Sequence, residues 1–220
     1  MALRKLGRHV DAVALAEQNS SDLTIWFGAD HEYTLATGIS LVNTRWAVGD
    51  LRGATVKASQ VLGGCERLFD ARHPMTLAML VNSAAVMRAL GDYRGARRRD
   101  EKAVADLRQV LGDDHQYTVC AMHNLAIDLA LLGHEGQALR ETEAVLMRSQ
   151  AVRGATHPDT IAAAINLALI RSDLGDRTTG QADLASALTS LARLLGAGHP
   201  LLDTAKNGVR IECDIEPPPT

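Results

Sequence analysis

Histidine recurs at one fixed interval along almost the whole chain. The members of this column stand 42 positions apart: His31, His73, His115, His157 and His199. A glycine column keeps the same step: Gly7, Gly49, Gly91, Gly133 and Gly175. Alanine and threonine columns follow it too: Ala12, Ala54, Ala96 and Ala138, ending at Gly180, and Thr34, Thr76, Thr118 and Thr160. Such a period is typical of repeat proteins, in which each unit buries its apolar face only on its neighbours.

Each unit is predicted to be a pair of helices. In the third unit, Met122, Leu125 and Leu129 recur at helical spacing, and Gly133 follows as a residue that enters the left-handed conformation at little cost. No segment shows the alternation of a strand. We expect helices at about 8–24, 32–48, 51–68, 75–90, 93–110, 117–132, 135–152, 159–174, 178–195 and 201–212. The sequence therefore predicts an all-α solenoid of antiparallel helix pairs.

The period also divides the chain. A solenoid over 1–212 is expected to consist of a half-repeat (1–26), four repeats (about 27–68, 69–110, 111–152 and 153–194) and a capping helix (195–212). Residues 213–220, acidic and rich in proline, are expected to be a disordered tail. Because the first unit lacks its first helix, either the N-terminal helix pairs with something else or the chain is a C-terminal piece of a longer protein, and we favour the second interpretation.

Composition narrows the function classes. The net charge is −3, and no basic stripe of the kind that binds nucleic acid is present, so we expect no nucleic-acid partner. No apolar run reaches the length of a membrane span, and no signal peptide opens the chain, so no membrane partner is expected either. The three cysteines are far apart and form no CxxC pair, which favours a reduced, cytoplasmic protein.

No metal site, cofactor or catalytic group is expected. Histidines one repeat apart are separated by more than the ~8–10 Å between packed helices, whereas zinc ligands lie within ~2.0–2.3 Å of the ion. Each histidine is instead expected to hydrogen-bond backbone groups in a loop before a helix. The sequence contains no phosphate-binding loop, dinucleotide fingerprint or nucleophile elbow. A reactive pairing of Cys120 with His123 lacks a group to orient the imidazole. We therefore predict a protein that is not an enzyme.

The best functional candidates form an asparagine column on the first helices. Its members are Ser40, Asn82, Asn124 and Asn166. An asparagine amide both donates and accepts hydrogen bonds, so a row of them could pair with the backbone of an extended peptide whatever its sequence. The alternative is that each amide bridges two neighbouring helices of the protein itself. Both interpretations stay open.

Variable residues surround this column, as a specificity surface would require. The candidates are Asn43, His123, Arg45, Arg88 and Trp46. Arginine is a natural partner for a carboxylate, so this surface would suit a peptide with an apolar side chain and an acidic end. The alternatives are that the arginines are solvated helix residues and that Trp46 is a packing anchor.

The pattern resembles a known repeat family. The motif reads Leu111-Gly112-Asp113-Asp114-His115, then Thr118, Asn124-Leu125-Ala126 and Leu132-Gly133, and related units run from Gly7 to Pro200. It is similar to tetratricopeptide repeats (TPR) of the 42-residue kinesin-light-chain type. The resemblance implies a right-handed superhelix whose first helices line a concave groove for peptides, with the asparagine position contacting peptide backbone. The ending Glu212-Cys213-Asp214-Ile215-Glu216-Pro217-Pro218 also resembles TPR proteins of FxSxx-COOH peptide-maturation systems, which implies a role around a small ribosomal peptide.

We therefore predict a non-catalytic scaffold that binds a peptide or partner protein in its concave groove. The alternative is a structural role, either as a homodimer formed through the N-terminal half-repeat or as a regulator of an upstream nucleotide-binding domain. The sequence identifies neither the ligand nor whether the protein's own tail occupies the groove.

Overall fold

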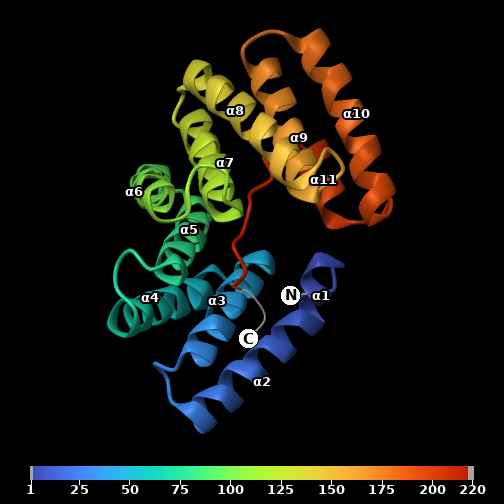
Figure 1. Cartoon of the computed structure of the whole chain (residues 1–220). Helices are drawn as coiled ribbons and strands as arrows, with labels where there is room; N and C mark the ends of the chain where they lie inside the picture. Colours follow the sequence, from blue (N-terminus) through green and yellow to red (C-terminus); the bar gives the residue numbers. More distant parts are fainter. Residues whose placement is uncertain (1, 218–220) are drawn as a thin grey trace. The chain divides into compact units, whose positions relative to one another are not determined.

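The computed structural model describes residues 2–217, which fold into two compact units (Figure 1). Unit 1 comprises the chain up to Gly112 together with the segment from Asp214 onward, and unit 2 comprises Asp113–Cys213. The described residues are helical or irregular and contain no strand. The all-α fold of consecutive helix pairs expected from the repeat is confirmed.

The described residues of unit 1 form these helices in chain order: α1 (Ala2–Lys5), α2 (His9–Phe27), α3 (Glu32–Ala47), α4 (Leu51–Leu68), α5 (Pro74–Ala89) and α6 (Tyr93–Leu111). Each of these helices packs mainly against its neighbours in sequence, and α3 also contacts α5. A buried apolar cluster joins α3, α4 and α5 through Leu35, Ile39, Val61 and Met79. The core is therefore a series of contacts between successive helices, as repeats require.

Unit 2 repeats this construction with α7 (Gln116–Leu131), α8 (Glu135–Arg153), α9 (Pro158–Asp173), α10 (Arg177–Leu195) and the short α11 (Pro200–Lys206). Its main cluster brings together Ile165 of α9, Leu191 of α10, Leu202 of α11 and Ile211 beyond the last helix. Helices α3, α5, α7 and α9 are the first helices of their pairs. None of the described helices is long and apolar enough to cross a membrane.

The recurring histidines begin helices. Each is the N-cap of the next first helix, and its Nδ1 accepts a hydrogen bond from the backbone N–H two residues on, as at His115, where the Tyr117 N–H lies 3.1 Å away. The same cap occurs at His31, His73, His157 and His199. A cap satisfies one of the backbone donors left free at a helix start. The structural interpretation of this column is confirmed, and the described residues contain no cluster that could hold a metal ion.

The C-terminal end differs from the sequence-based expectation. The helix predicted to run to residue 212 ends at Lys206, because Asn207 caps it and Gly208 adopts a φ of 74°. Residues 209–217, called the C-terminal segment below, are extended rather than helical. Disorder was expected from residue 213, but Cys213 and Ile215 are buried. The reason lies in the hydrogen bonds described next, and residues 218–220 lie outside the described part of the chain.

Candidate functional site

Three asparagines of the predicted column are almost completely buried on successive first helices. Asn82 lies on α5, Asn124 on α7 and Asn166 on α9, and none is more than 2% exposed. A buried amide needs hydrogen-bond partners, because leaving it unpaired costs about 1–3 kcal/mol. The partners are backbone groups of the C-terminal segment.

In unit 2, two asparagines each hold one residue of that segment through both of its backbone groups. The Ile211 N–H donates to Asn166 Oδ1 at 2.9 Å, and Asn166 Nδ2 donates to the Ile211 carbonyl at 2.9 Å. The Cys213 N–H donates to Asn124 Oδ1 at 2.9 Å, and Asn124 Nδ2 donates to the Cys213 carbonyl at 2.8 Å. Each side-chain amide thus makes the two hydrogen bonds that a residue of a neighbouring strand would make in an antiparallel β-sheet.

Unit 1 uses the same arrangement once more. The Ile215 N–H donates to Asn82 Oδ1 at 2.9 Å, and Asn82 Nδ2 donates to the Ile215 carbonyl at 2.7 Å. Asn43 of α3 adds a second donor to that carbonyl at 3.2 Å. One asparagine per repeat therefore pairs with every second residue of an extended chain. We call Asn82, Asn124 and Asn166 the asparagine ladder.

The pairing fixes which side chains of the segment face the protein. Successive side chains of an extended chain point to opposite sides, so residues 211, 213 and 215 share one side. These three are buried, whereas Glu212, Asp214 and Glu216 between and after them are only partly buried. The asparagines bind backbone atoms of the segment, and the side chains of residues 211, 213 and 215 pack against the protein.

Acidic side chains of the segment meet a cationic and polar group in unit 1. Arg4 of α1 forms ion pairs with Asp214 and Glu216. Ser40 Oγ donates to Glu216 Oε2 at 2.5 Å, and Asn43 Nδ2 donates to Glu216 Oε1 at 3.2 Å. Burial lowers the pKa of Arg4, but the two carboxylates outweigh it and raise that pKa, so the guanidinium stays charged. Glu216, which directly follows Ile215, is therefore held by specific contacts in unit 1.

His123 of α7 lies under the segment in unit 2. Its Nε2 is 2.9 Å from the Ile211 carbonyl and 2.7 Å from Asn166 Nδ2, and its Nδ1 is 3.6 Å from Cys213 Sγ. Burial lowers the pKa of His123, but Cys213 and the Ile211 carbonyl together raise it above its ordinary value. The protonated ring can donate to the sulfur and the carbonyl at once.

Five of the eight residues proposed from the sequence therefore contact the segment, and three do not. Those in contact are Asn43, Asn82, Asn124, Asn166 and His123. Arg45 instead binds Glu17 at 2.8 Å and the Gly53 carbonyl at 3.3 Å. Arg88 forms a buried ion pair with Asp100 at 3.1 Å. Trp46 packs against the core cluster of α3–α5, which is its predicted alternative role.

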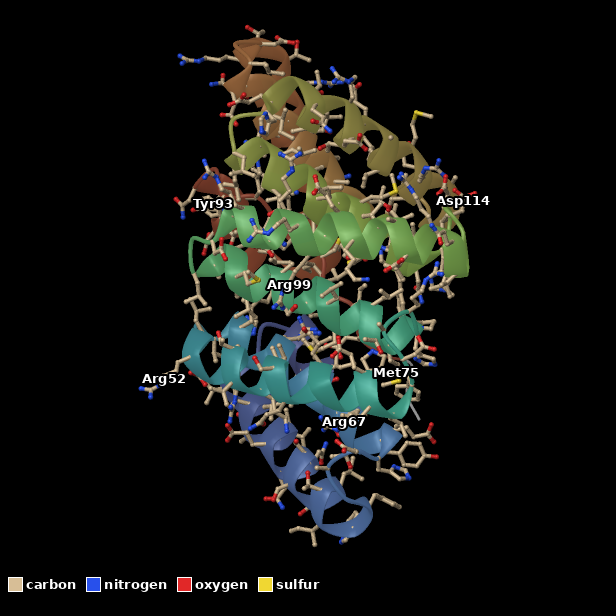
Figure 2. The ribbon with its side chains drawn as sticks, turned by 90° about the vertical axis from the view of Figure 1, so that its left-hand side faces the viewer. Arg52, Arg67, Met75, Tyr93, Arg99 and Asp114 are labelled. Carbon is tan, nitrogen blue, oxygen red and sulfur yellow. The ribbon has the colours of Figure 1, made fainter. Side chains whose placement is uncertain are left out.

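Other arginines of the protein also lie on helices without contacting the segment. Arg52 on α4 extends away from the protein in Figure 2, and Arg67, also on α4, is exposed and pairs with Asp30 at 2.7 Å. On α6, Arg97 is likewise bound to Glu101 at 2.8 Å. Position on a helix alone does not distinguish a ligand contact from such pairs.

Two contributors were not anticipated. Arg4 lies 212 positions from its partner Glu216, and no periodicity in the sequence connects them. Cys213 was assigned to a disordered tail, although the alternation of Ile211, Cys213 and Ile215 with acidic residues is the pattern of a half-buried extended segment. That alternation was the signal available in the sequence.

Comparison with known proteins agrees with this architecture. Residues 75–146 match the family described as tetratricopeptide repeat. This stretch of the chain is therefore similar to tetratricopeptide repeats. No curated protein matches it.

Solved structures of similar fold extend the TPR comparison to most of the chain. One is a Podosopora anserina protein assigned as a kinesin light chain, with nearly identical TPR-like repeats. The structure of its single-residue variant is 23% identical to this chain in sequence, with a TM-score of 0.64 over 88% of this chain and 91% of that one. The structure of the same protein without that substitution is also 23% identical, with a TM-score of 0.62 over 88% of this chain and 92% of that one. BtubC (BKLC) from P. vanneervenii is 18% identical, with a TM-score of 0.64 over 95% of this chain and 82% of its own. These similarities establish the fold.

Proposed function

We propose that this TPR protein is a non-catalytic module that binds an extended peptide on its first helices, with the C-terminal segment as a built-in competitor. The observation that carries the proposal is the pairing of both backbone groups of Ile211, Cys213 and Ile215 with the asparagine ladder. Because these bonds use only backbone atoms, any extended chain of suitable side chains can make them.

The segment also defines the ligand class. Its alternate residues Ile211, Cys213 and Ile215 are aliphatic or small, and Glu216 is held by Arg4 and Ser40. A competing peptide would carry small or aliphatic residues at three alternate positions, followed directly by an acidic residue. The resemblance to FxSxx-COOH systems and three cysteines that form no disulfide are consistent with a peptide partner in the cytoplasm.

Occupation by the segment sets the affinity that a ligand needs. A tethered segment has an effective concentration of about millimolar, so a peptide of equal intrinsic affinity binds only weakly until the segment leaves. Each ladder asparagine makes two hydrogen bonds worth a net ~0.5–1.5 kcal/mol apiece. Recognition is therefore the sum of several moderate contacts.

A labelled peptide of residues 209–217 tests the proposal. We expect it to bind the chain shortened after Gly208 and to bind the full chain at least tenfold more weakly. In the shortened chain, Asn124→Ala or Asn166→Ala should weaken binding about tenfold, which corresponds to ~1.4 kcal/mol.

Asn19→Ala is the matched control, because Asn19 is an exposed residue within α2. If the ladder variants bound the peptide as tightly as this control, the assignment of the binding surface would be wrong.

A structural role is the second candidate, supported by exposed apolar side chains on α2. Val10 near the start of α2 and Ile25 and Trp26 near its end are each at least 70% exposed. Association of two copies through this half-repeat would cover them. Light scattering distinguishes the candidates, since Trp26→Ser with Ile25→Ser should abolish a dimer and leave peptide binding unchanged.

A further inference from the structure

Two cysteines and a histidine meet where the C-terminal segment crosses α7. Cys120 and His123 are three residues apart on that helix, so their side chains lie on the same face. Cys213 of the segment lies with its Sγ 3.6 Å from His123 Nδ1 and accepts a hydrogen bond from the Cys120 thiol. All three side chains are buried within unit 2. Peptide binding uses the backbone of Cys213 and leaves its sulfur without a role.

The surroundings activate this sulfur. The hydrogen bond from Cys120, together with His123, lowers the pKa of Cys213 to about 6 although burial opposes this. The charge of Asp159 raises the pKa of both Cys213 and His123 and so favours the imidazolium partner. A thiolate beside an imidazolium is the reactive form of cysteine.

Cys65 provides a contrast within the same chain. It is buried on α4 in unit 1, where burial and the nearby Glu66 raise its pKa to about 11. It therefore stays a thiol, which is unreactive toward oxidants.

We propose that Cys213 and Cys120 form a peroxide-sensitive pair whose disulfide fixes the C-terminal segment on α7. The geometry that carries this is the convergence of both sulfurs and the His123 ring beneath the C-terminal segment, which is not itself helical. Local fluctuation of such a segment admits a small oxidant.

The chemistry balances with hydrogen peroxide as the oxidant. The Cys213 thiolate attacks one peroxide oxygen, the S–O bond forms as the O–O bond breaks, and the departing hydroxide takes a proton from the His123 imidazolium to give water. The Cys120 sulfur then attacks the sulfenic sulfur of Cys213. The S–S bond forms, the S–O bond breaks, and the hydroxide leaves as water with the Cys120 proton. Two thiols and one peroxide yield one disulfide and two waters.

The consequence rests on the proposed function. A disulfide to Cys120 holds the competitor on the ladder, so an external peptide cannot displace it. A small thiol reductant reverses this by two steps of thiol–disulfide exchange. The binding surface is thereby closed by peroxide and reopened by reduction.

Mass spectrometry of the full chain tests the bond directly. After peroxide treatment, alkylation and trypsin digestion, we expect the fragment Gln109–Arg140 to be joined to the fragment that begins at Ile211, with the loss of two hydrogen atoms. Cys65 should remain alkylated. Linkage through Cys65, or no intramolecular linkage between Cys120 and Cys213, would overturn the proposal.

Variants test whether His123 activates the Cys213 sulfur or whether the two cysteines react only because they lie close together. His123→Gln should slow formation of the bond at least tenfold near neutral pH, whereas Cys65→Ser should leave its rate unchanged. The shortened chain and its peptide test the proposed function without any disulfide. A missing bond in a chain whose peptide binding behaves as expected therefore rejects the redox proposal alone.

Discussion

At the scale of single residues, the protein distinguishes side chains that bind backbone from those that only stabilise helix pairs. Asparagine suits the first task because its amide presents one donor and one acceptor in the same plane as a peptide group does. Arg88 has the second task. Its guanidinium and the Asp100 carboxylate are 2% and 0% exposed and join α5 to α6. A buried carboxylate left without its partner is strongly destabilising.

Replacing Arg88 tests this assignment. Arg88→Ala should lower the free energy of unfolding by ~3–5 kcal/mol, because it breaks a fully buried ion pair by removing one of its two members. The control is Arg171→Ala, since Arg171 pairs with Asp183 at 2.7 Å at a partly exposed site and should cost about 1 kcal/mol or less. Denaturant titration measures both. Equal losses for the two variants would contradict the distinction.

The residue scale also shows how far sequence reasoning reached at the site. The asparagine column and His123 were predicted correctly as positions on the first helices, because a period of 42 places them without any knowledge of their partners. The identity of the partner was beyond reach, since Asn82 and Ile215 are 133 positions apart. The partners of Arg45 and Arg88 were beyond reach for the same reason, as they are set by packing rather than by period.

At the scale of helices, the closeness of a pair depends on the residue at one position. The alanine column is buried at Ala54, Ala96 and Ala138 where first and second helices meet. In the last pair that position is Gly180, and a Cβ there would lie 2.7 Å from the Ala168 carbonyl oxygen and 2.2 Å from Ser172 Oγ. Helices α9 and α10 therefore approach too closely for alanine.

Restoring the column residue should therefore destabilise the protein. We expect Gly180→Ala to cost ~1–3 kcal/mol, because the backbone of α9 must move to admit the methyl group. Gly136→Ala on α8 is the matched control: no atom lies within 4 Å of the added Cβ, so a gain of ~0.4–1 kcal/mol is expected. Thermal unfolding compares them. A stabilising Gly180→Ala would show that this contact is loose.

Helix existence was readable from the sequence because the signals are local. The histidine caps, the terminal glycines and the apolar spacing each act within one turn or one loop, and together they predicted the long helices to within a few residues. The predicted helix over 201–212 was wrong because it was extrapolated from the period, whereas Gly208 and the alternation after it favour an extended chain. The close approach of α9 and α10 at Gly180 was not predictable, because the sequence alone does not show whether the glycine in the alanine column is required there or only tolerated.

At the scale of the whole molecule, the C-terminal segment belongs to both units. Its residues up to Cys213 complete unit 2, where Ile211 joins the cluster of α9–α11, and its residues from Asp214 complete unit 1. Ile215 is buried against the first helices of unit 1 through Asn82 and Asn43. Each unit is therefore stabilised by a different part of the segment.

Charged substitutions should therefore act on one unit at a time. Ile211→Asp should raise amide hydrogen exchange mainly in α9 of unit 2, and Ile215→Asp mainly in α3 and α5 of unit 1, because each buries a carboxylate where an apolar side chain packed. Val209→Asp is the control, since Val209 is 55% exposed and precedes the ladder contacts. Hydrogen exchange followed by mass spectrometry resolves the helices separately. Unchanged exchange in α3 and α5 of a folded Ile215→Asp variant would mean that this part of the segment does not stabilise unit 1. An effect confined as expected would mean that a ligand displacing only the Ile215 end could open unit 1 while unit 2 keeps its part of the segment bound.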